Sequence, residues 1–334
     1  MTETSACVRT GSNVDPNPSV SVIMPAYNVA SMIMEALDSV FAQTYKNFEV
    51  IVINDGSPDT DMLERVLMPY LERIVYIKQQ NRRAAGARNT GIRQARGQFL
   101  AFLDSDDGWK PEYLASQMSV FERTPSLQMV YADAFYHPVS LPVPKRYKDA
   151  CPSHGPVTFQ ALVLEQCHVC VSCTVVRKQT ILNAGLFDEN LPCCDDYDMW
   201  LRVAYSGANI TYHQETLGWV RAGRPGSLGE SQLKTHEADL QILKKLEKLP
   251  ALGQIRRTAV TKAIAREQAL VQLESAKLSL STGRFSDARD SLRKANTFFQ
   301  SPKLRVVLLG LQMVPRLTML GSRAWYQLRG SGRA

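Results

Sequence analysis

Short apolar segments alternate with amphipathic segments over the first hundred residues of this 334-residue chain. The apolar segments at 20–24, 48–53, 74–77 and 99–103 have the length and composition of buried strands. Between them, apolar residues recur at the spacing of one helix face, for example over 33–41. Strands that alternate with helices form a mostly parallel sheet that is covered on both faces. The sequence therefore predicts an α/β domain.

Three of the expected strands end in polar turns, at Ala26–Asn28, Asn54–Gly56 and Asp104–Asp107. Ligands of parallel sheets bind beyond the carboxyl ends of the strands, so these turns mark one candidate site. Asp104 and Asp106 alternate along an extended chain and repel each other unless a cation lies between them. Oxygen ligands of this kind suit Mg²⁺ or Mn²⁺ carrying a phosphate group. The alternative is a simple acidic turn, which Asp and Gly also favour.

Several other classes of protein are disfavoured by the sequence. A GxGxxG motif does not follow the first strand, and GxxxxGK[ST] is absent, which argues against dehydrogenases and P-loop NTPases. The net charge of +7 is modest and no dense Lys/Arg run contains aromatic residues, so nucleic-acid binding is not expected. Cys167, Cys170 and Cys173 are evenly spaced, but no second metal-binding pair follows and the segment 169–176 reads as a strand.

The chain resembles family 2 glycosyltransferases. The resemblance rests on three segments in the family's order and covers roughly residues 20–228: VSVIMPAYNVASMIMEALDSVFAQTYKNFEVIVINDGS, NRRAAGARNTGI and FLAFLDSDD. It implies the GT-A fold, a Rossmann-like nucleotide-diphospho-sugar transferase fold with a mostly parallel sheet. It also implies a nucleotide-sugar donor, expected to be UDP-linked, and a divalent cation, Mn²⁺ or Mg²⁺. The implied reaction is inverting transfer to a hydroxyl acceptor in cell-surface polysaccharide or glycan synthesis.

The same resemblance assigns donor-binding residues. Pro25, Ala26 and Tyr27 would line the base pocket, with Tyr27 beside the nucleoside, and Asp55 would accept hydrogen bonds from the base or ribose. An ionised carboxylate suits amide and hydroxyl donors of this kind. The alternative for Asp55 is a turn residue that precedes Gly56.

Two further motifs complete the expected donor site: the DSDD turn, residues 104–107, and the ARN motif, residues 87–89. Asp104 and Asp106 would hold the metal on the diphosphate of the donor, and Ser105 between them belongs to the donor-binding set. Arg88 resembles the arginine that lies near the donor phosphates or near the acidic cluster. Its alternative is an arginine on a helix surface.

Asp196 is the candidate general base, because the family has an acidic pair followed by a helix with a tryptophan at this place. Asp195 stands where the family usually has Glu, which leaves open which carboxylate reaches the acceptor. The alternative for both is capping of the helix N-terminus. The segment 217–229 resembles the family's closing loop, and Arg221 and Arg224 are candidates to contact metal or phosphate there.

We expect three parts: a flexible leader over 1–18, a GT-A domain over 19–230 and an α-helical region over 231–334. Within the last part, one group of residues is spaced as in the second half of a tetratricopeptide-like helix pair: Leu278, Gly283, Ala288, Leu292 and Ala295. The segment 306–320 is apolar and flanked by arginines. It is expected either to lie on an anionic membrane surface or to pack into the core.

The sequence lacks a signal-peptide pattern and an apolar run of the length that spans a bilayer, roughly 20 residues. We therefore expect a cytoplasmic protein, peripheral on the inner membrane face if the C-terminal segment binds lipid. The expected partners are the nucleotide-sugar donor and a glycan, lipid-linked or other hydroxyl acceptor.

Two other functions compete with the transferase. A sugar nucleotidyltransferase would release pyrophosphate, but the PAYN turn lacks the Gly- and Arg/Lys-rich loop that such enzymes use after the first strand. A catalytically silent GT-A scaffold with a partner-binding helical tail would have no need of all the acidic positions.

Overall fold

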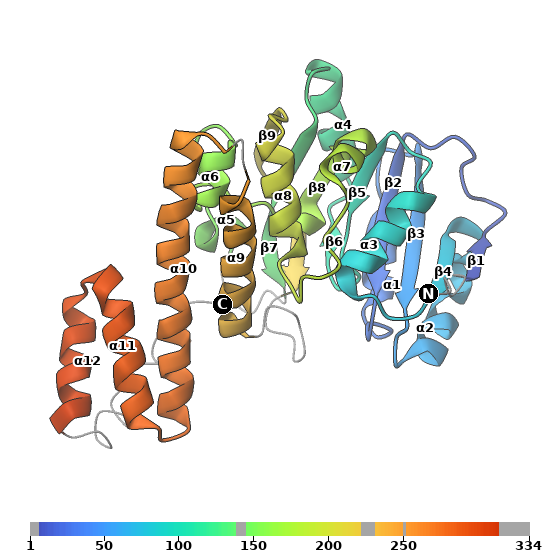
Figure 1. Cartoon of the computed structure of the whole chain (residues 1–334). Coiled ribbons are helices and arrows are strands. Elements are labelled where there is room, and N and C mark those ends of the chain that lie inside the picture. Colours follow the sequence, from blue (N-terminus) through green and yellow to red (C-terminus); the bar gives the residue numbers. More distant parts are fainter. Residues whose placement is uncertain (1–6, 138–144, 222–230, 250–251, 314–334) are drawn as a thin grey trace. The chain divides into compact units, whose positions relative to one another are not determined.

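The computed structural model describes residues 7–137, 145–221, 231–249 and 252–313 (Figure 1). The chain forms two compact units, Met1–Ala222 and Gly223–Ala334. The boundary expected from the sequence, between residues 230 and 231, lies slightly later in the chain.

The first unit is built on one nine-stranded sheet with the order β1-β4-β3-β2-β5-β8-β7-β9-β6. In chain order the strands are β1 Cys7–Thr10, β2 Val20–Ala26, β3 Phe48–Asp55, β4 Val75–Gln79, β5 Phe99–Phe102, β6 Gly108–Trp109, β7 Met129–His137, β8 Thr174–Arg177 and β9 Ile210–Arg221. The strands β4, β3, β2 and β5 pair in parallel, as the alternation of strands and helices predicts. Beyond β5 the pairing is mixed, because β8 runs antiparallel to both β5 and β7, whereas β7 and β9 are parallel.

The N-terminal segment differs from the expectation of a flexible leader. Residues 7–10 form β1, an exposed edge strand that pairs antiparallel with β4. The main chain continues this contact, since Gly11 N donates to the Ile74 carbonyl at 3.0 Å. Backbone hydrogen bonding along the open side of β4 therefore orders this part of the leader.

The helices of the first unit alternate with the strands as expected. They are α1 Ile33–Phe41, α2 Thr60–Leu67, α3 Arg83–Gln94, α4 Tyr113–Arg123, α5 Tyr147–Ala150, α6 Phe159–Val163, α7 Lys178–Ala184 and α8 Asp195–Tyr205, with 3₁₀ turns η1 Met68–Arg73 and η2 Val171–Cys173. Thr158 caps α6, because its Oγ1 accepts a hydrogen bond from Ala161 N at 3.1 Å.

Two segments depart from regular α-helices and strands. Helix α2 ends at Leu67, and a 3₁₀ helix with Pro69 in its first turn follows it. The strand expected over 169–176 begins only at Thr174, since Val171–Cys173 form a 3₁₀ turn. Cys170 and Cys173 both belong to the hydrophobic core, so burial accounts for them.

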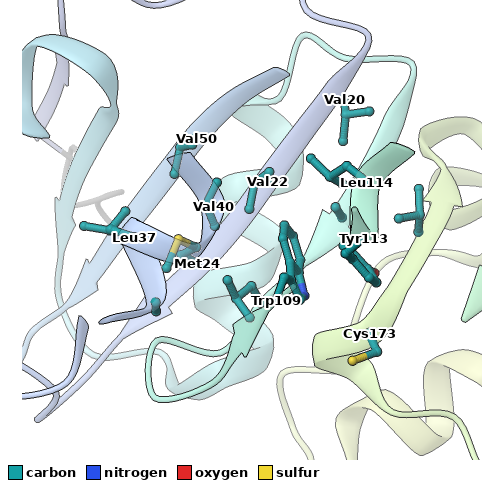
Figure 2. Packing of buried hydrophobic residues seen from close by; sticks show 14 of the residues in the cluster. Val20, Val22, Met24, Leu37, Val40, Val50, Trp109, Tyr113, Leu114 and Cys173 are labelled. Carbon is teal, nitrogen blue, oxygen red and sulfur yellow. The ribbon is translucent and has the colours of Figure 1, made fainter. Parts of the chain in front are cut away.

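The main core fills the space between one face of the sheet and α1 (Figure 2). Alternate residues of β2, such as Val22 and Met24, point into it and are fully buried. The ring of Trp109 stacks on Tyr113 with centroids 4.3 Å apart, and its Nε1 donates to the Ser172 carbonyl at 2.5 Å. Burial of large side chains of this type stabilises a fold by about 1.5–3 kcal/mol each. This core fixes the strand ends on which the polar turns lie.

A close backbone contact holds the chain just after the DSDD turn. Gly108 and Trp109 of β6 pair with Trp219 and Gly218 of β9 at the far edge of the sheet. A Cβ atom on Gly108 would lie 2.0 Å from Cζ2 of Trp219, which is closer than real Cβ contacts. Glycine is therefore required at this position by packing.

The second unit is entirely helical in the residues that the structure describes, with α9 Gln232–Glu247, α10 Gln254–Ser281, α11 Phe285–Phe299 and α12 Pro302–Met313. Helices α10 and α11 pack as an antiparallel pair around a small core of Ala276, Leu292 and Leu311. Gly283 supplies the left-handed turn between them, with φ of +75°. Of the residues expected to shape this helix pair, Ala288, Leu292 and Ala295 are buried, whereas Leu278 is half exposed. Among the described helices, those that are long enough to cross a bilayer are too polar to do so.

Candidate active site

The polar turns that follow β2, β3 and β5 lie at one edge of the sheet and are bonded to each other. Ala26 is opposite Asn54, so β2 and β3 end together, whereas Phe102, the last residue of β5, is opposite Ile23. Ser105 Oγ donates to the Pro25 carbonyl at 2.6 Å. Asn28 N donates to Ser57 Oγ at 2.7 Å, which joins the turns after β2 and β3. The sequence prediction that these turns meet at one edge is confirmed by these contacts.

The DSDD turn presents Asp104 outward and keeps Asp107 inside. The Asp104 side chain is 36% exposed, whereas Asp107 is 8% exposed as a residue. Asp107 accepts hydrogen bonds from Ser172 Oγ at 2.5 Å and from Arg221 N at 2.8 Å. Burial, followed by the charges of Asp104 and Asp106, raises the pKa of Asp107 well above its usual range. Asp107 therefore shapes the turn from within, while Asp104 remains accessible.

Arg88 on α3 joins the DSDD turn to the start of α8. Its Nη2 donates to Asp104 Oδ1 and its Nη1 donates to Asp195 Oδ2, both at 2.7 Å. The arginine is 4% exposed, so the alternative of a surface arginine is wrong. Burial disfavours its charge, but Asp104, Asp195 and Asp196 more than offset this effect and raise the pKa of Arg88 above its ordinary value. A permanently charged guanidinium thus binds acidic residues from two separate elements.

Asp195 and Asp196 begin α8 and differ in their surroundings. Asp195 is 5% exposed and is bound to Arg88. Asp196 is half-buried, and its Oδ1 accepts a hydrogen bond from Tyr197 N at 2.9 Å. Burial and the charge of Asp195 raise the pKa of Asp196 to about 6, although Arg88 acts in the opposite direction. Asp196 therefore combines a raised pKa with partial exposure, whereas Asp195 is engaged in an ion pair.

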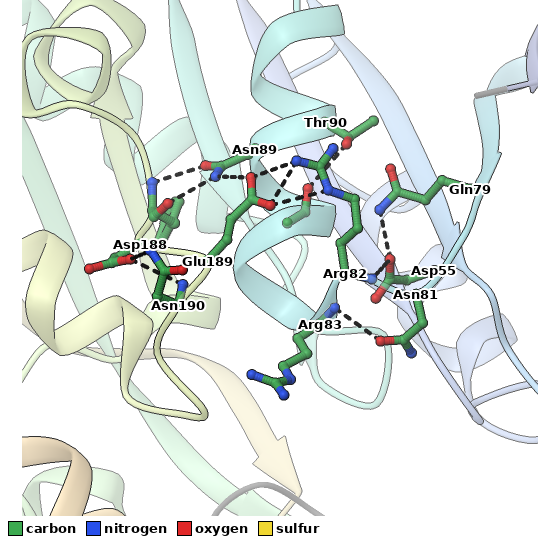
Figure 3. Close-up of polar contacts among 12 residues, drawn as sticks. Asp55, Gln79, Asn81, Arg82, Arg83, Asn89, Thr90, Asp188, Glu189 and Asn190 are labelled. Carbon is green, nitrogen blue, oxygen red and sulfur yellow. Dashed lines mark hydrogen bonds and ion pairs between the residues drawn. The ribbon is translucent and has the colours of Figure 1, made fainter. Parts of the chain in front are cut away.

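Asp55 at the end of β3 is buried and hydrogen-bonded within the protein (Figure 3). Its Oδ1 accepts from Gln79 Nε2 at 2.6 Å and from Arg82 N at 2.9 Å. Burial raises the pKa of Asp55 above its ordinary value, although these hydrogen bonds act against the shift. Tyr27 lies on the neighbouring turn and is 49% exposed, so its ring is accessible to a ligand.

A polar network continues from Arg82 to the loop that precedes α8 (Figure 3). The Arg82 guanidinium binds the Glu189 carboxylate with a shortest distance of 2.7 Å. Asn89 Nδ2 donates to Glu189 Oε1 at 2.9 Å, and Asn89 also exchanges two hydrogen bonds with the main chain of Phe187. The chain near Asp55 and the segment leading to Asp195 are therefore tied to the same helix, α3.

Arg221 lies at the end of β9 and is used in structural contacts. Its Nη2 donates to Glu35 Oε2 at 2.8 Å, and its Nε donates to the Asp106 carbonyl at 3.2 Å. The residues 217–221, expected to start a closing loop, are part of the strand. Arg224 lies outside the described residues.

Sequence reasoning missed three residues that organise the site: Ser172, Glu189 and Asn89. Asn89 was visible as part of the ARN motif, next to Arg88. Ser172 and Glu189 carry no signal in the sequence, because their partners are 65 and 107 residues away along the chain.

The donor set of the DSDD turn fits a divalent cation. Three carboxylates occupy one turn, and the charges of Asp104 and Asp106 both contribute to the raised pKa of Asp107. Such mutual repulsion is what a hard cation relieves, and carboxylate oxygens are its preferred ligands. One oxygen of Asp104 is already bound to Arg88, which leaves its second oxygen for a metal.

Comparison with known proteins decides the family. A family model described as Glycosyl transferase family 2 matches residues 21–183. An uncharacterised glycosyltransferase of Rickettsia prowazekii (strain Madrid E) is 30% identical over 243 residues, which cover 70% of this chain and 74% of the relative. This chain belongs to glycosyltransferase family 2. The match to three longer Rickettsia relatives spans only 33–37% of their length.

A second relative of this family 2 glycosyltransferase is named for its activity. The UDP-Glc:alpha-D-GlcNAc-diphosphoundecaprenol beta-1,3-glucosyltransferase WfaP of Escherichia coli is 30% identical over 217 residues, which cover 61% of this chain and 80% of the relative. It connects the chain to relatives in polysaccharide biosynthesis.

Solved structures confirm the fold of the family 2 glycosyltransferase. TarS of S. aureus, in complex with UDP-GlcNAc, matches with a TM-score of 0.59 and 18% identity over 88% of this chain and 87% of that chain. A mannosyltransferase of Pyrobaculum calidifontis, in complex with GDP-Man and Mn²⁺, matches with a TM-score of 0.59 and 16% identity over 95% of this chain and 90% of that chain. The GT-A fold and the helical C-terminal region predicted from the sequence are confirmed.

Proposed function

We propose that this glycosyltransferase moves a sugar, with inversion, from a UDP-linked donor to a hydroxyl group of a glycan or lipid-linked acceptor. We propose that its products belong to cell-surface polysaccharide or glycan synthesis. The observation that carries the proposal is the ion-paired cluster in which Arg88 binds both Asp104 of the DSDD turn and Asp195, next to Asp196. This cluster brings together the predicted metal ligand and the predicted base.

The donor would lie along the bonded turns at the sheet edge. Pro25, Ala26 and Tyr27 would contact the base, and the exposed ring of Tyr27 offers a surface for stacking. Asp55 would accept hydrogen bonds from the base or ribose. Gln79 and Arg82 hold one of its oxygens in place. Ser105 supports the same region through its bond to the Pro25 carbonyl.

Asp104 and Asp106 would hold the divalent cation, Mn²⁺ or Mg²⁺. When bound, the cation supplies positive charge that stabilises the departing diphosphate. The structure of the P. calidifontis mannosyltransferase holds Mn²⁺, which supports this assignment. Arg88 orients Asp104 and keeps a second positive charge close to the same carboxylates.

Asp196 would accept the proton of the acceptor hydroxyl. A carboxylate with a pKa of about 6 is largely ionised at neutral pH and is a stronger base than an ordinary aspartate. Attack of the deprotonated hydroxyl on the face opposite the diphosphate inverts the anomeric centre. Asp195 would act as a positioning residue, because its carboxylate is bound to Arg88.

Two similar proteins support a UDP-linked donor and a lipid-linked acceptor. WfaP of E. coli is named for a UDP-glucose donor and a diphosphoundecaprenol acceptor, and the TarS structure contains UDP-GlcNAc. We therefore also propose that this protein works on the cytoplasmic side of a membrane, close to its acceptor.

The test of the reaction measures release of nucleoside diphosphate by the full chain. A melting-temperature screen of nucleoside diphosphates and nucleotide sugars, with and without Mn²⁺, first identifies the donor, because a ligand of the native state raises the melting temperature. Asp196→Asn and Asp104→Ala should each abolish transfer while the chain stays folded. Asp61→Asn, an exposed position on α2, is the matched control and should retain activity.

The products distinguish the rival functions. An anomeric coupling constant of the product, measured by NMR, should show inversion relative to the donor. Pyrophosphate in place of nucleoside diphosphate would indicate a nucleotidyltransferase. Binding of a donor without turnover on any hydroxyl acceptor would favour a silent scaffold, and normal turnover by Asp196→Asn would remove the assigned base.

A further inference from the structure

The positive charge of the chain is concentrated at its C-terminal end. All 32 acidic residues lie at or before Asp290, together with 31 of the 39 basic residues. Residues 291–334 contain eight Lys or Arg residues and no carboxylate side chain. The last 44 residues therefore account for the whole net charge of +7, and the remainder of the chain is almost neutral. A charge distribution of this kind points to an anionic partner for this end of the molecule.

Helix α12 exposes an apolar stripe within this basic region. Val306, Leu309 and Met313 are 69%, 59% and 79% exposed, and their spacing of three and four residues places them on one helix face. Lys303 and Arg305 are exposed one turn before Val306 and Leu309. We call these five residues the α12 surface.

The opposite face of α12 holds the helix in the second unit. Leu304, Val307, Leu308 and Leu311 pack against α11 and the core around Ala276 and Leu292. The helix is therefore apolar on two sides, one packed and one exposed. Packing on α11 explains why the helix forms, but it does not explain the exposed stripe. Contiguous exposed apolar residues of this kind mark a binding surface more often than isolated ones do.

We propose that the α12 surface binds the face of a membrane that contains anionic lipids. Apolar side chains that lie between basic residues, without a nearby acidic residue on the helix, are typical of helices that lie in the lipid interface. The apolar stripe would enter the acyl boundary, and the cations would contact the lipid phosphates. A binding surface for nucleic acid would not require three exposed apolar side chains, and a protein partner would not require the excess of cations.

This inference extends the proposed location at a membrane and is independent of the transfer reaction. Binding can be measured without donor, metal or acceptor, so failure of the surface and failure of the proposed function give different results. Sequence outside the described residues continues the same composition, since residues 314–334 contain four arginines and no acidic residue.

The experiment is sedimentation of the full chain with two kinds of vesicle. One contains phosphatidylcholine alone, and the other also contains about 30% phosphatidylglycerol, to represent an anionic leaflet. We expect binding only to the anionic vesicles, weakened by salt. Val306→Gln/Leu309→Gln should lower the apparent affinity at least about tenfold, because the apolar contact is lost. Lys303→Gln/Arg305→Gln should lower the apparent affinity of the unaltered chain by a factor of about five for each cation removed.

Matched controls come from α10, which belongs to the same unit. Ile255 is 76% exposed and Lys262 is exposed, so Ile255→Gln and Lys262→Gln make comparable changes outside the α12 surface. Both should bind vesicles as the unaltered chain does. Circular dichroism verifies that all variants keep their helix content.

Three results would overturn the inference. Equal binding to neutral and anionic vesicles would remove the role of charge, and undiminished binding by Val306→Gln/Leu309→Gln would remove the role of α12. Absence of vesicle binding, combined with self-association or duplex DNA binding that the α12 variants abolish, would assign the surface to a second copy or to nucleic acid.

Discussion

Arg88 offers the most direct test of how the site is held together. In Arg88→Met the aliphatic part of the side chain is kept and the guanidinium is lost. Asp195, with a side chain 7% exposed, then has a buried charge without its cation, whereas Asp104 is 36% exposed and can be solvated. Removal of one partner from a buried ion pair destabilises a protein by about 3–5 kcal/mol. We expect a loss in this range, which arises mainly from Asp195.

Urea unfolding followed by tryptophan fluorescence measures this loss. Three of the four tryptophans, Trp109, Trp200 and Trp219, belong to the first unit, which contains the site. Asp195→Asn/Arg88→Met, which also removes the orphan charge, should recover part of the loss. A loss below about 1 kcal/mol, the range of exposed ion pairs, would refute the reasoning. The reasoning would also be refuted if the double variant lost more unfolding free energy than the two single variants lose together.

Other predictions concern the base, the Arg82–Glu189 network and the second unit. Because the pKa of Asp196 is raised to about 6 and the base must be ionised, kcat/KM for transfer should fall about tenfold per pH unit below that value; a flat profile from pH 4.5 to 8 would contradict the role. Glu189→Gln should lower the free energy of unfolding, measured in urea, by about 1–2 kcal/mol, because it weakens the hydrogen bonds to Asn89 and Arg82. Arg82→Gln should lower the same free energy by less than about 1 kcal/mol, because the Arg82 guanidinium is half exposed. The Glu267 carboxylate is hydrogen-bonded to His236 at 2.7 Å and raises the pKa of His236. The pair should therefore stabilise the second unit fully at pH values below the ordinary pKa of His, about 6.5. This stabilisation should be lost as the pH rises through the raised pKa of His236. Calorimetry of His236→Gln should show melting that depends less on pH across this window.

The strands and turns at the sheet edge could be predicted because their signals are local. A buried strand such as β3 is a continuous apolar run, and the polar turn after it is visible in the next few residues. The position of Asp104, Asp55 and Asp196 at strand or helix ends followed from the same local patterns, and the resemblance to the family supplied their roles.

The contacts between those residues could not be predicted, because they join distant parts of the chain. Arg88 and Asp195 are 107 residues apart, and the sequence does not show that the arginine is buried between two acids. Tertiary packing also overrode local propensity at 171–173, where part of an apolar, cysteine-rich stretch forms a 3₁₀ turn that carries Ser172 to Asp107. At the N-terminus, the open side of β4 ordered residues whose own sequence carries little strand signal.

Gly108 has a consequence for anyone who wishes to redesign this enzyme. Of the neighbouring acidic positions, Asp104 has room for other side chains, because it is 36% exposed. Position 108 has no such freedom, because even a methyl group would collide with the indole of Trp219. A library over residues 104–108 should therefore keep the glycine codon at 108 fixed, or vary it jointly with the codon for residue 219.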